Sequence, residues 1–137
     1  MEKNNSLVIA VDFDGTIVED AYPSIGKPML FAFETLKRLQ KDGHRLILWT
    51  YRSDIRLKEA VDFCKKNNLE FYAVNKSFPE ERFDYTKSRK IHADIFIDDR
   101  NAGGFIGWGE IYQMLSNPKY NPNHLQKKKK GFFSLFR

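Results

Sequence analysis

The feature that most constrains the fold is a set of short apolar runs, each ending at or beside polar residues. The first, Leu7 to Val11, is five apolar residues long and stops at Asp12. Uninterrupted apolar runs of this length are typical of strands that are buried on both faces, as in a parallel sheet. Three later segments are also predicted to be strands: 45–50, 70–74 and 94–97.

Apolar residues at helical spacing separate these predicted strands. One set, which Gly43 ends, consists of Leu30, Phe31, Phe33, Leu36 and Leu39. A second set, which Asp54 is placed to cap, consists of Ile55, Leu57, Val61 and Phe63. A last helix is expected near residues 110–115. Strands alternating with helices are typical of βαβ units, so we predict an α/β fold: a single doubly wound, Rossmann-like parallel sheet flanked by helices.

The charge distribution divides the chain into a neutral body and a basic tail. The net charge is +5, but five of the 23 basic residues and none of the 18 acidic ones lie in residues 127–137. The rest of the chain is therefore neutral overall, which gives no support to nucleic-acid binding by the body. We expect a catalytic domain over residues 1–116, a linker over 117–126, and a flexible basic-aromatic tail over 127–137.

The tail suggests a second activity. Its four lysines precede Phe132, Phe133, Leu135 and Phe136, so it could bind an anionic membrane or dock in the groove of a protein partner. No run approaches the roughly 20 apolar residues that span a bilayer, no signal peptide is evident, and Cys64 is the sole cysteine. We therefore expect a cytoplasmic protein that could be peripheral at a membrane.

Chemically useful side chains follow the predicted strands. Asp12 and Asp14 follow the first strand, Thr50 ends the second, and Asp98 and Asp99 follow the fourth. In doubly wound sheets, ligands bind beyond the carboxyl ends of the strands. Carboxylates that meet at one edge repel one another, and a bound divalent cation is the simplest way to offset that repulsion.

These residues, in this order, resemble the haloacid dehalogenase (HAD) phosphohydrolase superfamily. The resemblance covers residues 7–116 and rests on the run Asp12-Phe-Asp-Gly-Thr16, on Thr50, on a lysine, and on the pair Asp98-Asp99. The segment from Lys90 to Asp99 is similar to a small capless group, in which a lysine lies eight residues before the pair. The resemblance implies a phosphatase that depends on Mg²⁺.

The resemblance also implies a role for each matched residue. Asp12 would be the nucleophile that forms an aspartyl-phosphate, and Asp14 the acid and base that serves the leaving oxygen and then water. The metal would be bound by the side chain of Asp12, the backbone carbonyl of Asp14, and Asp98, the last directly or through water. Asp99 would complete the metal shell or orient Lys90.

Three other residues would contact the phosphoryl group. Thr50 would donate a hydrogen bond to it, Lys90 would balance its charge, and Gly15 would let the backbone pass close to it. Lys87 competes with Lys90 for the lysine role. Side chains that could touch the substrate or merely face solvent are Arg52, Arg56, Asn75 and Arg100.

The segments where larger HAD enzymes insert a cap domain are short here. Residues 15–28 and 75–89 cannot each form a domain of about 50 residues. We expect an open site that takes either a macromolecular phosphate ester or a small one, the latter closed over by loops and a neighbouring subunit of a homo-oligomer. The alternative function is a catalytically weak HAD-fold binding module that residues 127–137 tether to a membrane or partner.

Overall fold

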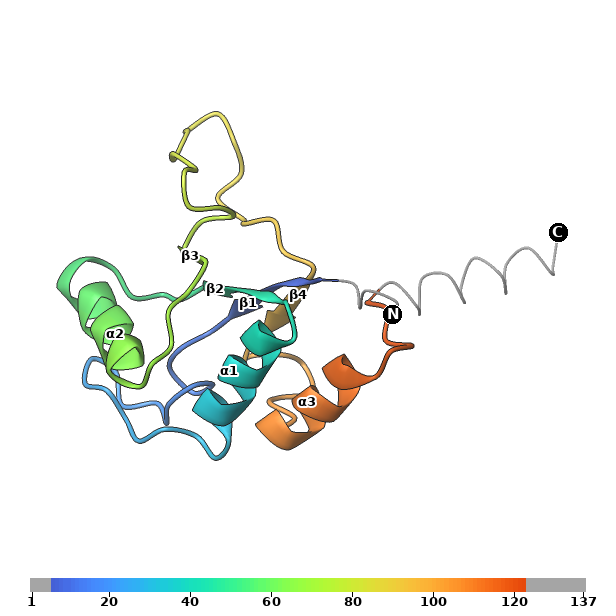
Figure 1. The fold of residues 1–137 in the computed structure, drawn as a ribbon. Coiled ribbons are helices and arrows are strands. Elements are labelled where there is room, and N and C mark those ends of the chain that lie inside the picture. The colour runs from blue at the N-terminus through green and yellow to red at the C-terminus, as the bar shows by residue number, and fades with distance from the viewer. Residues whose placement is uncertain (1–5, 123–137) are drawn as a thin grey trace, which may run out of the picture.

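A four-stranded parallel sheet forms the centre of the computed structural model, which describes residues 6–122 (Figure 1). Its strands are β1 (Val8–Val11), β2 (Arg45–Leu48), β3 (Ala73–Val74) and β4 (Ile95–Ile97), in the order β3-β2-β1-β4. The predicted α/β fold with a parallel sheet is therefore confirmed, and its arrangement is compatible with a Rossmann-like topology. The predicted tail lies outside the described residues, as do residues 123–126 of the predicted linker.

The register of the sheet explains why the strands are shorter than predicted. Val11 at the end of β1 is paired with Leu48 and Ile97, so β1, β2 and β4 end level with one another. Beyond that level the Trp49 amide still donates to the Val11 carbonyl (2.9 Å), and the chain then leaves the sheet. Thr50 therefore follows β2 instead of ending it.

Three helices accompany the sheet: α1 (Ala32–Lys41), α2 (Asp54–Lys66) and α3 (Trp108–Ser116). Helix α1 begins after Phe31, whose φ of 65° is incompatible with a helix, and it ends before Gly43, as predicted. The prediction that Asp54 caps α2 is wrong. Asp54 is the first residue of the helix, Ser53 occupies the cap position, and no side chain caps the helix there.

The two faces of the sheet are covered differently. Residues of all three helices pack in one buried cluster with Ile9 and Val11, while the intervening Ala10 belongs to a second, smaller cluster. That second cluster contains Ile91, from the connection between β3 and β4. Residues 75–94 form neither a helix nor a strand, so an irregular segment covers the face where a doubly wound fold usually has a helix.

The strand order fixes where a ligand can bind. From β1 the chain proceeds through β2 to β3 on one side, and then crosses to β4 on the other side of β1. The crevice between the carboxyl ends of β1 and β4 is thus the switch point of the sheet. The connection from Asp12 to Phe31 borders it and is anchored by Ile17 and Val18, which are both fully buried.

None of the helices in residues 6–122 is long and apolar enough to cross a membrane.

Candidate functional site

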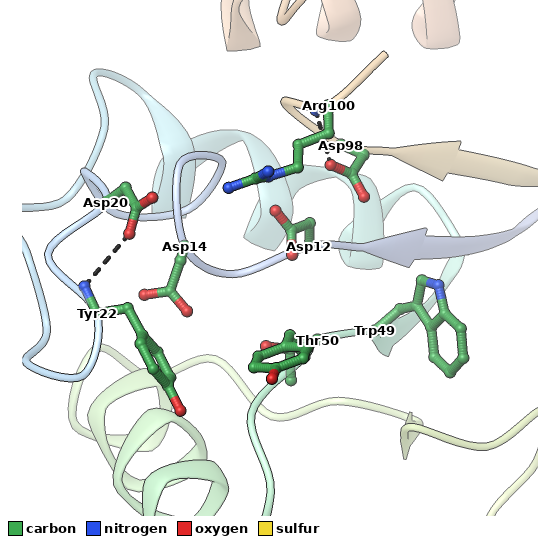
Figure 2. A pocket seen from close by; sticks show the side chains of 9 residues that line it. Asp12, Asp14, Asp20, Tyr22, Trp49, Thr50, Asp98 and Arg100 are labelled. Carbon is green, nitrogen blue, oxygen red and sulfur yellow. Dashed lines mark hydrogen bonds between the residues drawn. The ribbon is translucent and has the colours of Figure 1, made fainter.

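A pocket of about 790 Å³ lies at the carboxyl ends of the strands (Figure 2). Its walls come from the ends of β1, β2 and β4 and from the loops that follow them. The lining residues are Asp12, Asp14, Asp20, Tyr22, Trp49, Thr50, Tyr51, Asp98 and Arg100. The predicted convergence of residues that follow different strands is therefore observed, and five of them were named from the sequence as site residues or as possible substrate contacts.

Three carboxylates converge where β1 and β4 end. Asp12, Asp98 and Asp99 each offer an oxygen, and these oxygens all lie within 4.8 Å of one another. The Oδ1 atom of Asp99 is buried and has no hydrogen-bond partner among the described residues. A buried acceptor without a donor is costly, and a hard cation held by oxygen ligands would satisfy it.

The environment of Asp12 opposes its negative charge. The pKa of Asp12 is raised to about 7, first by burial and then by its hydrogen bond with the Asp99 carboxyl and the charges of Asp98 and Asp99. The Thr16 hydroxyl donates to Oδ2 of Asp12 at 3.2 Å, and Thr16 is itself fully buried. The side chain that the sequence predicts as the nucleophile is therefore held in place and surrounded by like charges.

Gly15 is required by the packing of Asp99. Gly15 has a φ of +83°, and a Cβ atom added there would collide with the Asp99 carboxylate. The glycine thus allows Asp99 to lie against the loop that follows β1. From the sequence we expected Gly15 to make room for a phosphate; in the structure it makes room for a carboxylate of the acidic cluster.

Asp14 lies two residues from Asp12 but has a cation of its own. The Nε and Nη2 atoms of Arg52 donate to its two carboxylate oxygens, each at 2.8 Å. The Arg52 side chain is fully buried, whereas that of Asp14 is 16% exposed toward the pocket. These hydrogen bonds raise the pKa of Arg52 above its usual value. Bidentate pairing fixes both the position and the orientation of Asp14.

Arg52 also ties together the two loops that form the pocket. Its Nη1 donates to the Pro23 carbonyl at 3.1 Å and its Nη2 to the Ser24 carbonyl at 2.8 Å. Its guanidinium lies 5.1 Å from the ring centroid of Phe13 and 5.2 Å from that of Tyr22. Arg52 is therefore a structural element of the site and not a solvated surface charge.

Thr50 lines the pocket in a loop held by side-chain bonds. Its amide donates to Oδ1 of Asn75 at 2.8 Å, and its hydroxyl accepts the Arg52 amide at 3.2 Å. Asn75 directly follows β3 and adopts a φ of 53°, which turns its amide toward the loop after β2. Asn75 thus positions Thr50, and it does not line the pocket itself.

The structure does not bring Lys90 to the acidic cluster. Its Nζ lies 5.6 Å from the ring centroid of Phe96, and both Lys90 and Lys87 line a separate hollow formed by residues 75–91. The reason is the direction of β4. Residues before a parallel strand lie at its amino edge, as Asp94 shows by donating its amide to the carbonyl of Val8 at the start of β1. The acidic pair lies at the opposite edge.

The remaining arginines separate into two environments. Arg56 forms an exposed ion pair with Glu59 at 3.1 Å, as expected of a surface charge. Arg100 lines the pocket, and its guanidinium extends between Asp20 and Asp12 (Figure 2). It is therefore the cation among the pocket-lining residues.

Five residues of the site were given no role from the sequence: Thr16, Asp20, Tyr22, Trp49 and Tyr51. Thr16 belongs to the first motif but received no role. Asp20 and Tyr22 lie in a segment that reads only as a loop, and Tyr51 is an aromatic residue beside a strand end. Their positions depend on loop conformation, which apolar periodicity does not encode.

Comparison with known proteins shows that the chain is similar to one whose structure has been solved. No family model matches the chain, and no curated protein matches it. The structure of a conserved protein from Bacteroides thetaiotaomicron is 56% identical in sequence, with a TM-score of 0.79, over 84% of this chain and 93% of that one. Identity of this extent over nearly the whole of the other chain shows common descent. The chain belongs to the same family as this conserved Bacteroides thetaiotaomicron protein.

Proposed function

We propose that this protein is a magnesium-dependent phosphohydrolase of the HAD type that cleaves phosphomonoesters through an aspartyl-phosphate on Asp12. One observation carries the proposal: Asp12, Asp98 and Asp99 converge within 4.8 Å at the switch point of the sheet. The resemblance of the sequence to HAD phosphohydrolases names the same three residues.

The residues present fit a divalent cation. No donor from residues 6–122 reaches the buried Oδ1 of Asp99, and burial together with the neighbouring Asp99 and Asp98 carboxyls raises the pKa of Asp12. Asp12, Asp98 and Asp99 would hold the ion through their side chains, with the backbone carbonyl of Asp14 as a further ligand. When bound, Mg²⁺ would neutralise charge on the phosphoryl oxygens that would otherwise repel the nucleophile.

The reaction divides between the two aspartates of the first loop. A carboxylate oxygen of Asp12 forms a bond to phosphorus while the bond from phosphorus to the leaving oxygen breaks, and Asp14, which must enter this step protonated, gives that oxygen its proton and becomes the carboxylate that serves the next step. Water then attacks the phosphorus, Asp14 takes its proton, and the bond to Asp12 breaks. Arg52 keeps Asp14 beside Asp12, and each Asp14 oxygen retains a lone pair that Arg52 does not use.

Other residues of the pocket would hold the phosphoryl group. Thr50 can donate its hydroxyl proton, because that oxygen serves only as an acceptor toward Arg52. The cationic role that the resemblance gives to Lys90 we assign to Arg100, which lines the pocket, while Lys90 lies over Phe96. Gly15 serves indirectly, by allowing Asp99 to approach.

The site would be open to solvent and without a cap. Residues 15–28 and 75–89 form no helix or longer strand of their own; the first has only isolated bridges at Val18. We accordingly propose that the enzyme is a small capless member of the superfamily that acts in the cytoplasm. A phosphate ester of either a small molecule or a macromolecule could reach Asp12.

The test is release of phosphate from a panel of phosphomonoesters, including para-nitrophenyl phosphate, with Mg²⁺ or with EDTA. We expect turnover that requires Mg²⁺ and that Asp12→Asn abolishes. Asp62→Asn is the matched control, because Asp62 is an exposed aspartate of α2 paired with Lys58. If the wild type and Asp12→Asn release phosphate equally across the panel, the proposed function is wrong.

A further inference from the structure

Two tyrosines stand at the mouth of the pocket that contains Asp12. Tyr22 comes from the loop after β1 and Tyr51 from the loop after β2, and both line the pocket. Their ring centroids are 6.1 Å apart, with planes at 71°. Tyr22 is 48% exposed and Tyr51 is 89% exposed. The pocket thus has carboxylates at one end and an exposed aromatic pair at its mouth.

The position of Tyr22 is coupled to that of the catalytic residues. The buried Arg52 guanidinium that grips Asp14 at 2.8 Å also lies 5.2 Å from the centroid of the Tyr22 ring. Single exposed aromatic side chains are ordinary and need no explanation. Here the Tyr22 ring, which is paired with Tyr51, contacts the Arg52 side chain that also orients Asp14. This contact fixes the Tyr22 ring relative to Asp12, where the phosphate would be attacked.

Trp49 is a less suitable stacking surface. It lines the pocket, but its indole points away from Tyr22 and Asp14 (Figure 2). It packs against the second cluster of the sheet, which includes Ala10 and Ile47. The aromatic surface available to a ligand in the pocket is therefore the pair Tyr22 and Tyr51.

The size and charge of the pocket restrict the rest of the substrate. A volume of about 790 Å³ lies in the range of roughly 300–1,000 Å³ that suits organic ligands, and is far more than a phosphoryl group needs. Asp20 extends its carboxylate into this space, with Oδ1 accepting the Tyr22 amide at 3.2 Å (Figure 2). A carboxylate in that position accepts hydrogen bonds from hydroxyl groups and repels a second anionic group.

We propose that the substrate is a nucleoside monophosphate. Its phosphate lies at Asp12, its ribose hydroxyls donate to Asp20, and its base stacks on the more exposed ring of Tyr51, with the ring of Tyr22 against the edge of the base. A planar base suits an exposed aromatic pair, because stacking on aromatic side chains accepts any base. This inference rests on the proposed function and specifies the leaving group.

The test compares substrates that differ only by the base. Adenosine and uridine 5′-monophosphates are measured against ribose 5-phosphate, with Mg²⁺. We expect kcat/KM for each nucleotide to exceed that for ribose 5-phosphate at least tenfold, mainly through KM; tenfold is ~1.4 kcal/mol. Tyr51→Ala should reduce this ratio to below about three, and Tyr51→Phe should retain it.

Tyr85→Ala provides the matched control. Tyr85 is 88% exposed and also forms an edge-on pair, with Phe83 at 4.7 Å, but it does not line the pocket. We expect this variant to keep the wild-type ratio. A wild-type ratio near one, or equal loss in Tyr51→Ala and Tyr85→Ala, would overturn the proposal.

A binding measurement distinguishes failure of the inference from failure of the proposed function. Calorimetry with Asp12→Asn and Mg²⁺ should show tighter binding of adenosine 5′-monophosphate than of ribose 5-phosphate, by at least tenfold. Nucleotide binding of this kind without turnover by the wild type would refute the phosphohydrolase and keep the nucleotide site. Turnover of ribose 5-phosphate without nucleotide preference would keep the phosphohydrolase and refute the nucleotide site. Absence of both turnover and binding would refute both proposals.

Discussion

Asp12 and Asp14 are two residues apart in one loop, yet the protein treats their charges in opposite ways. Asp14 receives two hydrogen bonds of 2.8 Å from the buried Arg52. Asp12 faces Asp98 and Asp99 instead, and its pKa is raised to about 7. Among residues 6–122, Asp14 has a hydrogen-bonded cation, whereas Asp12 forms no ion pair and has two carboxylates beside it.

The difference shows how one loop can be both rigid and reactive. The pair of Asp14 with Arg52 joins two loops and keeps them in place whatever is bound, because the guanidinium also holds the carbonyls of Pro23 and Ser24. The acidic cluster, by contrast, is destabilising until a cation enters it. Asp14 is thus held by the fold itself, whereas the proposed metal and phosphoryl group bind beside Asp12.

The largest effect is expected from Asp12→Asn. Loss of the nucleophile should reduce phosphate release at least about a thousandfold. The same substitution removes one of three crowded carboxylates, so the melting temperature in EDTA should rise. A substitution that merely removes a favourable contact would lower it. Phosphate release and thermal melting on the same preparation check both parts. A fall in melting temperature would show that the cluster is not under electrostatic strain.

Arg52→Met should be the most destabilising of these substitutions. Removing one partner of a buried ion pair typically costs about 3–5 kcal/mol, and the two loops would also lose their connection. Urea unfolding measures the loss, with Arg56→Met as the control because its pair with Glu59 is exposed. The double variant with Asp14→Asn should recover part of the stability. If Arg52→Met and Arg56→Met are equally stable, the comparison between the two aspartates loses its basis.

Gly15→Ala separates backbone strain from collision with the acidic cluster. Gly104 offers a matched control, since its φ of +75° is similar to the +83° of Gly15 but a Cβ there meets no atom of residues 6–122 within 4 Å. We expect Gly104→Ala to cost about 1 kcal/mol, and Gly15→Ala about 2–3 kcal/mol with weaker Mg²⁺ binding. Unfolding in urea and calorimetric titration with Mg²⁺ give the two quantities. Equal costs would mean that Asp99 moves aside freely.

The raised pKa of Asp12 predicts a pH-dependent response to metal. Because the pKa of Asp12 is about 7 in the folded protein, against an ordinary value of 3.8, the folded state binds this proton more tightly than the unfolded chain does. The resulting contribution to the free energy of unfolding is fully present below pH 3.8 and is lost as the pH rises to about 7. In EDTA, the wild type should therefore lose stability relative to Asp12→Asn across that window. Added Mg²⁺ should raise the melting temperature more at pH 8 than at pH 5. A gain that does not change with pH would place the ion elsewhere.

The sequence predicts the acidic cluster because parallel topology governs it. Once Leu7 to Val11 and the run before Asp98 are recognised as parallel strands, residues that follow them must meet at one edge. Both the parallel sheet and the convergence of Asp12 with Asp98 and Asp99 could therefore be predicted from the sequence. The position of Lys90 over Phe96 depends instead on the course of the irregular segment before β4, which the spacing in the sequence does not encode.

The partner of Asp14 could not be predicted in the same way. Arg52 reaches it from another loop, and the course of these loops depends on residues such as Phe31 and Asn75, whose φ angles of 65° and 53° no apolar pattern reveals. For the same reason, it could not be predicted that residues 75–94, instead of a helix, cover the second face of the sheet. Contacts that follow from strand direction can be inferred from sequence, whereas contacts between loops need coordinates.

The smallest effect is expected from Lys90→Ala, which completes the comparison by asking which cation serves the substrate at Asp12. Arg100 extends into the pocket (Figure 2). The Nζ of Lys90 instead lies 5.6 Å from the ring centroid of Phe96. We expect Arg100→Ala to lower kcat/KM about tenfold and Lys90→Ala less than threefold, because an exposed cation outside the pocket contributes only through screened charge. Lys87→Ala, from the same hollow, serves as the control for Lys90→Ala. A loss for Lys90→Ala that exceeds the loss for Arg100→Ala would mean that residues 75–94 rearrange when substrate binds, and that the lysine spacing identifies the working site better than the arrangement described by this structure.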